Sequence, residues 1–285
     1  MNKRRPRFRR RALPWLLILP HLGGVLFFYG YPFLWSFLYS VGSRDGFHLQ
    51  AYRDTVTNDA FRLAMRNTII FTGVAVPLLL LLSLAVALAL HHWLKGSRLL
   101  LHLFILYYAV PSVSIAYTWT LLFASSGFLN RGLTSVQGAT SVNWLDGGWL
   151  FVPLVSFFLV KYSAYPTLIL FGGLGAIPRE LEEEAELQGT TFWQKTRYLT
   201  LPLLAPELGF TAVLGFFFSL RVYKDAYAMF GAYPPKSVYL LQHFMNNNFI
   251  SLHLERLTVA SSLTAIGVAA VILAFFRRNR SAYFP

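Results

Sequence analysis

The sequence contains no cysteine, which excludes disulfide bonds and thiolate-ligated metal sites in this chain. Charged residues are also few: they make up 13% of the 285 residues, whereas 55% are hydrophobic, a balance typical of membrane proteins. No stretch has the spacing Gly-x-x-x-x-Gly-Lys-Ser/Thr, the loop that holds nucleotide phosphates in P-loop ATPases. We therefore do not expect this chain to hydrolyse ATP.

Long apolar runs dominate the sequence. A helix needs about 20 mostly apolar residues to cross the roughly 30 Å hydrocarbon core of a bilayer. Six segments meet this requirement: residues 13–41, 69–90, 99–123, 149–173, 205–229 and 257–276. Pro20 and Pro32 are expected to kink the first of them. We therefore predict an all-α, polytopic membrane protein with six transmembrane helices.

The distribution of lysine and arginine predicts the orientation. If the N-terminus lies in the cytoplasm, the cytoplasmic segments hold fifteen of these residues and the outer segments hold seven. This bias follows the positive-inside rule, so we predict a multi-pass protein of the prokaryotic plasma (inner) membrane with both termini cytoplasmic. The basic start shows no cleavage site before or within the first apolar run, which we interpret as a retained helix.

We expect three regions along the chain. Residues 1–12 form a basic cytoplasmic tail, residues 13–276 a single transmembrane domain, and residues 277–285 a second cytoplasmic tail. The net charge is +13, and the basic tail lies beside a membrane helix. We therefore expect it to meet anionic membrane lipid and no nucleic acid.

The most charged helix-forming passage spans residues 177–206. Pro178 marks the start of a helix over 180–188, and Gly189 suits the left-handed residue that closes it. Thr190 or Thr191 can cap a second short helix over 192–198, which Pro202 is expected to end. The passage therefore predicts a polar helix–glycine–helix elbow between two membrane segments, suited to docking a soluble partner.

This passage resembles the EAA loop of permease subunits in binding-protein-dependent ABC importers of the sugar (maltose/glycerol-phosphate) type. The positions that match the family pattern are Ile177, Pro178, Glu180, Leu181, Glu183, Ala185, Gly189, Leu199, Leu201, Pro202, Leu203, Leu204 and Pro206. Three positions depart from the pattern: Glu184, Gln188 and Thr190. The resemblance extends more weakly over nearly the whole chain, for example to the Asn67–Thr68 pair.

The resemblance implies a type I ABC importer permease fold and a transport subunit that is not an enzyme. The coupling loop, residues 177–204, would dock on a separate ATPase, with contacts from Glu183, Ala185, Gly189, Phe192, Leu201 and Pro202. The implied partners are a second homologous permease in a heterodimer, two ATPase subunits and an extracytoplasmic solute-binding protein. ATP and Mg²⁺ would bind to the ATPases, so no cofactor or metal is expected on this chain.

The resemblance also places sugar contacts on the helices before and after the elbow. The matching positions are Lys161, Tyr162, Tyr165, Gly215, Phe218, Ser219 and Val222. The last four follow i, i+3, i+4, i+7 and so share one helix face. Aromatic rings suit sugar faces and hydroxyls suit sugar hydroxyls. For Phe218 and Val222 ordinary helix packing is an equal alternative.

Lys161 lies in the middle of an apolar segment, where a charge costs on the order of 3 kcal/mol. It should therefore face a polar cavity or a partner, pair with the second permease, or extend to the interface. Lys224 stands where the family has an acid, which favours an acidic saccharide, such as a uronide or phosphorylated polyol, against a neutral oligosaccharide. Lys224 could instead be neutralised locally by Asp225. We interpret His91 and His92 as interface residues.

Two other classes of protein remain as alternatives. A membrane-embedded enzyme acting on lipid or glycan would need clustered acids, histidines or a metal site at one membrane face, and only scattered acids are present. A self-contained secondary transporter would show an internal repeat and buried carboxylates for ion coupling. Neither is evident in the sequence, and both alternatives leave the elbow unexplained.

Overall fold

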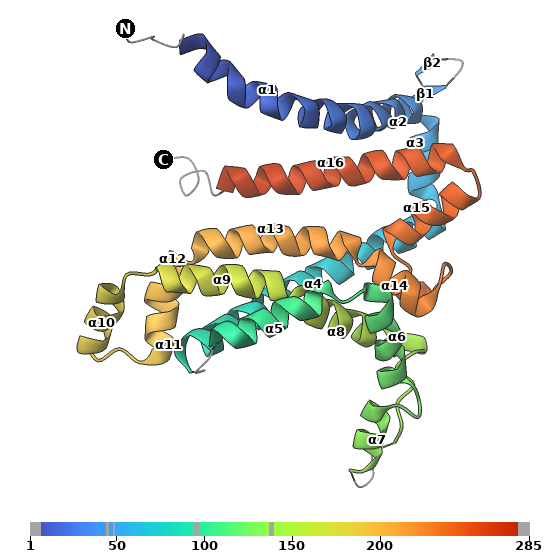
Figure 1. The fold of residues 1–285 in the computed structure, drawn as a ribbon. Helices are drawn as coiled ribbons and strands as arrows, with labels where there is room; N and C mark the ends of the chain where they lie inside the picture. The colour runs from blue at the N-terminus through green and yellow to red at the C-terminus, as the bar shows by residue number, and fades with distance from the viewer. Residues whose placement is uncertain (1–6, 44–45, 48, 94–96, 137–139, 279–285) are drawn as a thin grey trace. The chain divides into compact units, whose positions relative to one another are not determined.

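The computed structural model describes residues 7–43, 46–47, 49–93, 97–136 and 140–278, so parts of both predicted tails lie outside the described residues. Helices make up nearly all of the described chain (Figure 1), which confirms the all-α prediction. Within these residues, strands occur only as a short antiparallel pair, β1 (Gly42–Ser43) and β2 (Gly46–Phe47). The chain divides into two compact units, residues 1–58 with 248–268 and residues 59–247 with 269–285.

The first unit contains the N-terminal membrane segment. This segment consists of α1 (Arg7–Val25), a π-helical turn η1 (Leu26–Gly30) and α2 (Tyr31–Val41), followed by the strand pair and α3 (Gln50–Thr57). The part of α16 up to residue 268 also belongs to this unit. Ser40 at the end of α2 is buried and shares hydrogen bonds with the hydroxyls of Tyr52, at 2.9 Å, and Ser262, at 3.3 Å.

The second unit carries the elbow and the membrane segments between α3 and α15. Its helices are α4 (Asp59–His92), α5 (Ser97–Ala109), α6 (Ser112–Phe123), α7 (Phe128–Thr134), η2 (Gly147–Leu150), α8 (Phe151–Tyr162), α9 (Ala164–Ala176), α10 (Arg179–Leu187), α11 (Phe192–Lys195), η3 (Thr196–Thr200), α12 (Leu201–Leu203), α13 (Ala205–Arg221), α14 (Tyr223–Phe230) and η4 (Lys236–Val238). Helices α15 (Leu241–Ile250) and α16 (Leu254–Arg278) each contribute residues to both units.

The core of the second unit forms along one face of α4. Phe71, Ala75 and Leu79 are fully buried and follow the four-residue spacing of a helix face. They pack against α8, where the ring of Phe158 meets that of Phe71 edge to face at 5.4 Å. Helix α4 also packs against α9 and α13, so a single long helix supports both membrane segments that flank the elbow (Figure 1).

The described chain holds five helices long and apolar enough to cross a membrane, and six if the bent pair 147–162 and 164–176 is one span. This agrees with the predicted number, but the third predicted span is wrong as a single helix. Residues 99–123 break at Val110 and Pro111 into α5 and α6, and the span-length helix is 112–134. Proline lacks an amide N–H and disfavours a helical residue before it, which explains the break.

Two other prolines widen a helix without ending it. A π-helical turn ends two residues before Pro32, and another ends two residues before Pro202. In an α-helix a proline ring clashes with the carbonyl four residues earlier, here those of Phe28 and Tyr198, and both lie inside the widened turns. The prediction that Pro202 ends the second elbow helix is therefore wrong, because the helical backbone continues to Leu203.

Two asparagines fasten the loops of the second unit. The Asn67 amide donates to the carbonyls of Lys236 and Tyr239, at 2.6 and 3.0 Å, while Thr68 accepts from the Leu241 amide. The buried Asn130 binds residue Val142 through both its side-chain oxygen and its amide, at 3.0 and 2.9 Å. The Asn67–Thr68 pair therefore has a structural role in holding the segment 236–241. The bonds of Asn130 hold the loop after α7 to that helix.

Candidate functional site: a polar elbow and a buried polar cluster

The elbow begins with α10, which ends in a left-handed glycine as predicted. Gly189 has φ +72°, and the amide of Thr190 reaches back to the Ala185 carbonyl at 3.2 Å. The Thr190 hydroxyl donates to the same carbonyl at 2.7 Å. These bonds satisfy a carbonyl that the helix end leaves unpaired, so they fix the direction in which the chain leaves α10.

Thr191 caps the second elbow helix, α11. Its side chain accepts from the Gln194 amide, and the Gln194 side chain accepts from the Thr191 amide at 2.8 Å, which forms a capping box. Thr191 is therefore the cap, and Thr190 belongs to the closure of α10. Both halves of the elbow are defined by local hydrogen bonds.

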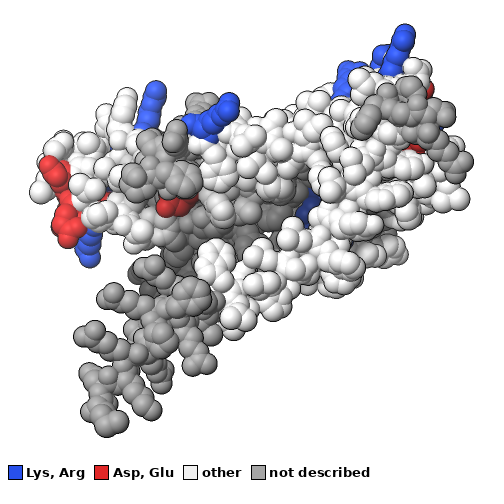
Figure 2. Space-filling view, turned by 90° about the horizontal axis from the view of Figure 1, so that it is seen from above, with Lys and Arg blue, Asp and Glu red and all other residues white. Residues whose placement is uncertain are grey.

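Lys195 joins the two elbow helices, a link that the sequence reasoning missed. Its Nζ lies 2.8 Å from Glu186 Oε1 and 3.9 Å from Glu182 Oε2. The lysine side chain is only 10% exposed, whereas that of Glu186 is 65% exposed, so only the lysine is shielded from solvent. The sequence signal for this link is the four-residue spacing of Glu182 and Glu186, which places them on one helix face. The spacing does not show that the chain folds back to bring Lys195 against that face. Figure 2 shows acidic side chains gathered at its left edge, on the side where Figure 1 places α10.

The elbow rests on the end of α4. The Phe192 ring lies 5.5 Å from the His92 ring and 5.1 Å from the Trp93 ring, and His91 meets Phe171 of α9 at 6.1 Å. The two histidines therefore pack against aromatic rings of the elbow and α9, and their place at the membrane interface stays a prediction. These contacts place α11 directly against the end of α4.

The predicted ATPase-coupling residues fall into two groups. Glu183, Gly189 and Pro202 are exposed, whereas Ala185, Phe192 and Leu201 are half-buried. Glu183 is paired with Arg179 at 2.8 Å along the outer face of α10. Two apolar side chains that the sequence reasoning missed are also exposed on the elbow, Leu187 at 89% and Trp193 at 75%. Their role in docking stays a prediction, and the mixture of apolar and charged groups suits a protein partner.

Lys161 has a structural partner inside the second unit. It is 4% exposed, and its Nζ donates to the carbonyls of Tyr108 and Val110, at 3.2 and 2.5 Å. These carbonyls lie where α5 ends before Pro111, so the helix break leaves them without intrahelical partners. The lysine thus supplies the hydrogen bonds that a broken helix loses in an apolar region. The sequence instead predicts that Lys161 faces a polar cavity or a partner subunit, or extends to the membrane interface. The two backbone carbonyls are none of these partners.

The neighbouring residue, Tyr162, binds a buried carboxylate. Its hydroxyl donates to Asp225 Oδ2 at 2.7 Å, and Asp225 is fully buried. Tyr162 also stacks on Phe218 with ring centroids 5.1 Å apart. Asp225 is therefore not neutralised by the exposed Lys224, and the sequence reasoning missed its burial. Lys161 and Tyr162 precede the 46° bend between α8 and α9, so one bend contacts both the α5–α6 break and the start of α14.

The predicted substrate-path residues are mostly internal in the second unit. Lys161, Tyr162, Gly215, Phe218, Ser219 and Val222 are buried. Ser219 shares a hydrogen bond with Thr72 at 3.0 Å, and a Cβ on Gly215 would approach Leu79 and Val76 within 3.3 Å. Tyr165 is 42% exposed and lies edge to face with Tyr108 at 4.7 Å. The structure brings six of the seven into one packed region, and their contact with substrate stays a prediction.

No group of three or more His, Asp or Glu side chains among the described residues could hold a metal ion. Binding of ATP and Mg²⁺ to a separate ATPase chain stays a prediction.

Replacing Lys161 by methionine tests the cap on the broken helix. Methionine keeps the unbranched side chain up to the ε-carbon but lacks the donating Nζ, so the carbonyls of Tyr108 and Val110 lose their partner. We expect Lys161→Met to lower the free energy of unfolding by about 1–3 kcal/mol, measured in detergent. Lys224→Met, an exposed lysine of the same unit, serves as the control. Equal stability of Lys161→Met and the parent protein would show that the cap contributes nothing.

The Lys195–Glu186 pair predicts a pH dependence of the elbow. The hydrogen bond and charge of Lys195 lower the pKa of Glu186. A lowered pKa in the folded state means that the pair stabilises the elbow above the ordinary glutamate range and is lost as pH falls through the lowered value. Carbon-13 NMR of the glutamate carboxyls, assigned with Glu186→Gln, should find this depressed midpoint. In Lys195→Gln the midpoint should rise, and an unchanged midpoint would contradict the pairing.

Comparison with known proteins places this geometry in a family. Residues 81–279 match the family described as "Binding-protein-dependent transport system inner membrane component". The chain is 31% identical, over 80% of each sequence, to the trehalose/maltose transport system permease protein MalF of Thermococcus litoralis. It is 30% identical to the sn-glycerol-3-phosphate transport system permease protein UgpA of Yersinia pestis, over 82% of this chain and 79% of that one.

A solved structure has the same fold. It is a bacterial alginate ABC transporter in complex with a periplasmic protein that holds an alginate pentasaccharide. The likeness has a TM-score of 0.82 at 18% identity and covers 97% of this chain and 96% of that one. The six-span count, the elbow between two membrane segments and the family match over most of the chain agree. The chain belongs to the family of inner-membrane components of binding-protein-dependent transport systems.

Proposed function

We propose that this chain forms half of the translocation path of an ATP-driven importer for a sugar or oligosaccharide, and that the elbow couples the path to a separate ATPase. The observation that carries the proposal is the construction of the elbow. Its two helices are joined by the Lys195–Glu186 pair at 2.8 Å, and Phe192 anchors it to the end of α4. A polar element built in this way can transmit a push from a soluble partner to the membrane helices.

In this proposal the elbow would transmit movement of the ATPase to the membrane helices. The exposed side chains of the elbow, including Leu187 at the end of α10, would meet an ATPase that binds ATP and Mg²⁺. Closure of two ATPase subunits would displace the elbow, and α4 would carry the movement toward α8, α9 and α13. The chain itself would perform no hydrolysis. A second homologous permease would complete the path, and an extracytoplasmic solute-binding protein would deliver the substrate.

The orientation belongs to the same proposal. An elbow that meets an ATPase must lie in the cytoplasm, and the excess of lysine and arginine on that side supports this. With six spans, both termini then lie in the cytoplasm as well.

The substrate is proposed to be a saccharide because the relatives' names refer to trehalose, maltose and glycerol-phosphate transport and the structural neighbour carries alginate. An acidic saccharide is supported by a structural neighbour involved in the import of the acidic polysaccharide alginate, and not by Lys161. Lys161 is engaged with the carbonyls of Tyr108 and Val110, so it is not an available cation. Arg221 and Lys224 are exposed and remain as candidate anion contacts. Uptake of matched neutral and acidic sugars by the whole importer would decide between the two.

Gly189→Ala tests the coupling role. A Cβ at this position meets nothing within 4 Å, so the change acts only through its positive φ, a strain of about 1–2 kcal/mol. We expect binding-protein-stimulated ATPase activity and sugar uptake to fall up to about tenfold in proteoliposomes holding the whole importer. Gly175→Ala, in α9 with equally open surroundings, should leave both activities unchanged.

The outcome separates the rival classes of transporter. A loss of uptake together with loss of stimulated ATPase activity supports coupling through the elbow. If Gly189→Ala and Gly175→Ala behave alike, the elbow does not transmit the ATPase motion. Uptake by the chain alone, driven by an ion gradient without any ATPase, would instead identify a secondary transporter.

A further inference from the structure

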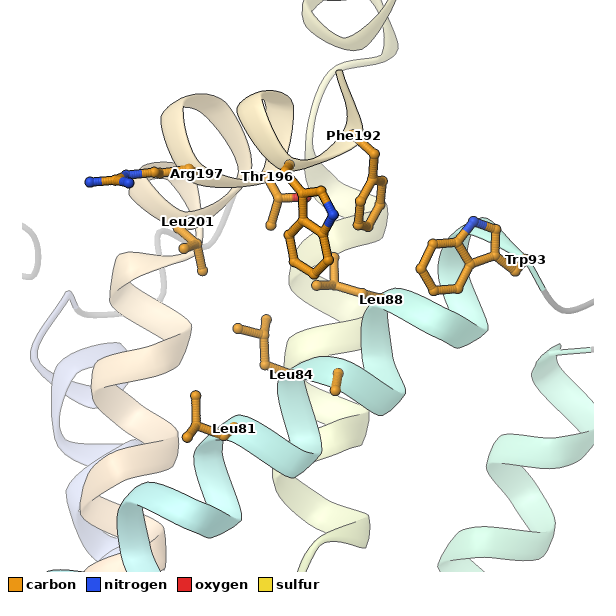
Figure 3. Close-up of a pocket in the computed structure, with 10 residues that line it drawn as sticks. Leu81, Leu84, Leu88, Trp93, Phe192, Thr196, Arg197 and Leu201 are labelled. Carbon is orange, nitrogen blue, oxygen red and sulfur yellow. The ribbon is translucent and has the colours of Figure 1, made fainter. Parts of the chain in front are cut away.

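A groove opens between α4 and the elbow on the membrane side of α11. Its volume is about 490 Å³, within the range of ligand-binding sites. One wall is the face of α4 that carries Leu81, Leu84 and Leu88, and the other is formed by the elbow around Phe192, Trp193 and Arg197. Figure 3 shows Leu84 and Leu88 directed toward the elbow helix and Arg197 extending away from them at the rim.

We propose that this groove binds an anionic membrane phospholipid, with one acyl chain along α4 and the headgroup phosphate at Arg197. The wall residues on α4 follow the i, i+3, i+7 spacing of one helix face, and this helix is one of the membrane-spanning helices. Leu81 is 63% exposed. A groove with this apolar wall in a membrane helix is suited to hydrocarbon.

The rim of the groove matches the level of lipid headgroups. Trp93 and Trp193 line it and are 65% and 75% exposed, and exposed tryptophans are typical of the membrane–water interface. Trp93 directly follows α4 and Trp193 lies in α11, and the rings of both contact that of Phe192. The acyl chain would therefore extend from the tryptophans into the bilayer along Leu84 and Leu81.

Arg197 supplies the charge that favours an anionic lipid. In the part of the chain that the structure describes, the ion pairs of the elbow join its glutamates to Arg179 and Lys195, and no carboxylate lies within ion-pair distance of Arg197. Its guanidinium lies 5.6 Å from the centre of the Tyr198 ring, at the surface. A guanidinium binds phosphate through paired hydrogen bonds, and a basic residue near the membrane attracts anionic lipid.

The test uses the whole importer in nanodiscs that contain phosphatidylglycerol or phosphatidylcholine with a photoreactive diazirine in the acyl chain. Cross-linked peptides are then mapped by mass spectrometry. We expect phosphatidylglycerol to label the peptides around Leu84 and Trp193 about fivefold more than phosphatidylcholine, the ratio expected for one basic residue near the surface. Labelling requires no transport, so its failure is separate from failure of the proposed function.

Two variants and two matched controls sharpen this test. Ala85→Phe fills the groove and should abolish labelling by both lipids, whereas Ile69→Phe, on an exposed part of the same helix, should not. Arg197→Gln should remove the preference for phosphatidylglycerol, whereas Arg179→Gln, on the same elbow outside the groove, should keep it. Arg197→Gln still tests the proposal if Ala85→Phe does not assemble.

Three results would overturn the proposal. They are equal labelling of the groove by the two lipids in the parent importer, labelling that Ala85→Phe leaves intact, and no labelling of the groove peptides by either lipid. The last result would mean that no lipid covers this face.

Discussion

The structure of the second unit depends on one constraint: backbone groups inside an apolar region must all be hydrogen-bonded. Helices satisfy this along their length, but Pro111 interrupts the third predicted span and leaves carbonyls exposed at the end of α5. Lys161 reaches them from α8. The charged side chain of Lys161, which is costly to bury in the membrane, thereby lies where two backbone carbonyls lack a hydrogen-bond donor. The adjacent Tyr162–Asp225 bond ties the same turn of α8 to α14.

Through these contacts the membrane helices meet at a common junction. The elbow connects this junction to the polar surface beyond the membrane segments. Breaks in three membrane segments, at Val110, Ser163 and Val222, are linked through α8. The segment that bends at Ser163 continues through α9 directly into the elbow, and the segment whose helix is interrupted at Val222 begins just after the elbow. In the proposed coupling, a movement of the elbow would act on both helices that carry the junction, and a lipid beside Phe192 would contact the same part of the elbow.

Local signals predicted the elbow well and the buried cluster poorly. Gly189 and Pro178 act through their own backbone geometry, so the turn and the helix start could be read from the sequence. The Lys195–Glu186 pair depends on how far the chain folds back, and the partners of Lys161 are carbonyls, which every residue possesses. The X-Pro step at Val110 was the available signal for a break in the third span. Side-chain burial, as at Asp225, follows from tertiary packing and has no local sequence signature.

The docking of the elbow on an ATPase is the central claim, and the absence of cysteine makes it directly measurable. A single Leu187→Cys, at the exposed end of α10, would be labelled with benzophenone maleimide in the purified importer and cross-linked by light. Phe128→Cys in α7, which is also exposed, is the matched control. The account predicts an adduct between Leu187→Cys and the ATPase subunit whose yield changes when ATP is added. Adducts only with lipid or the second permease, or equal ATPase adducts from both positions, would contradict it.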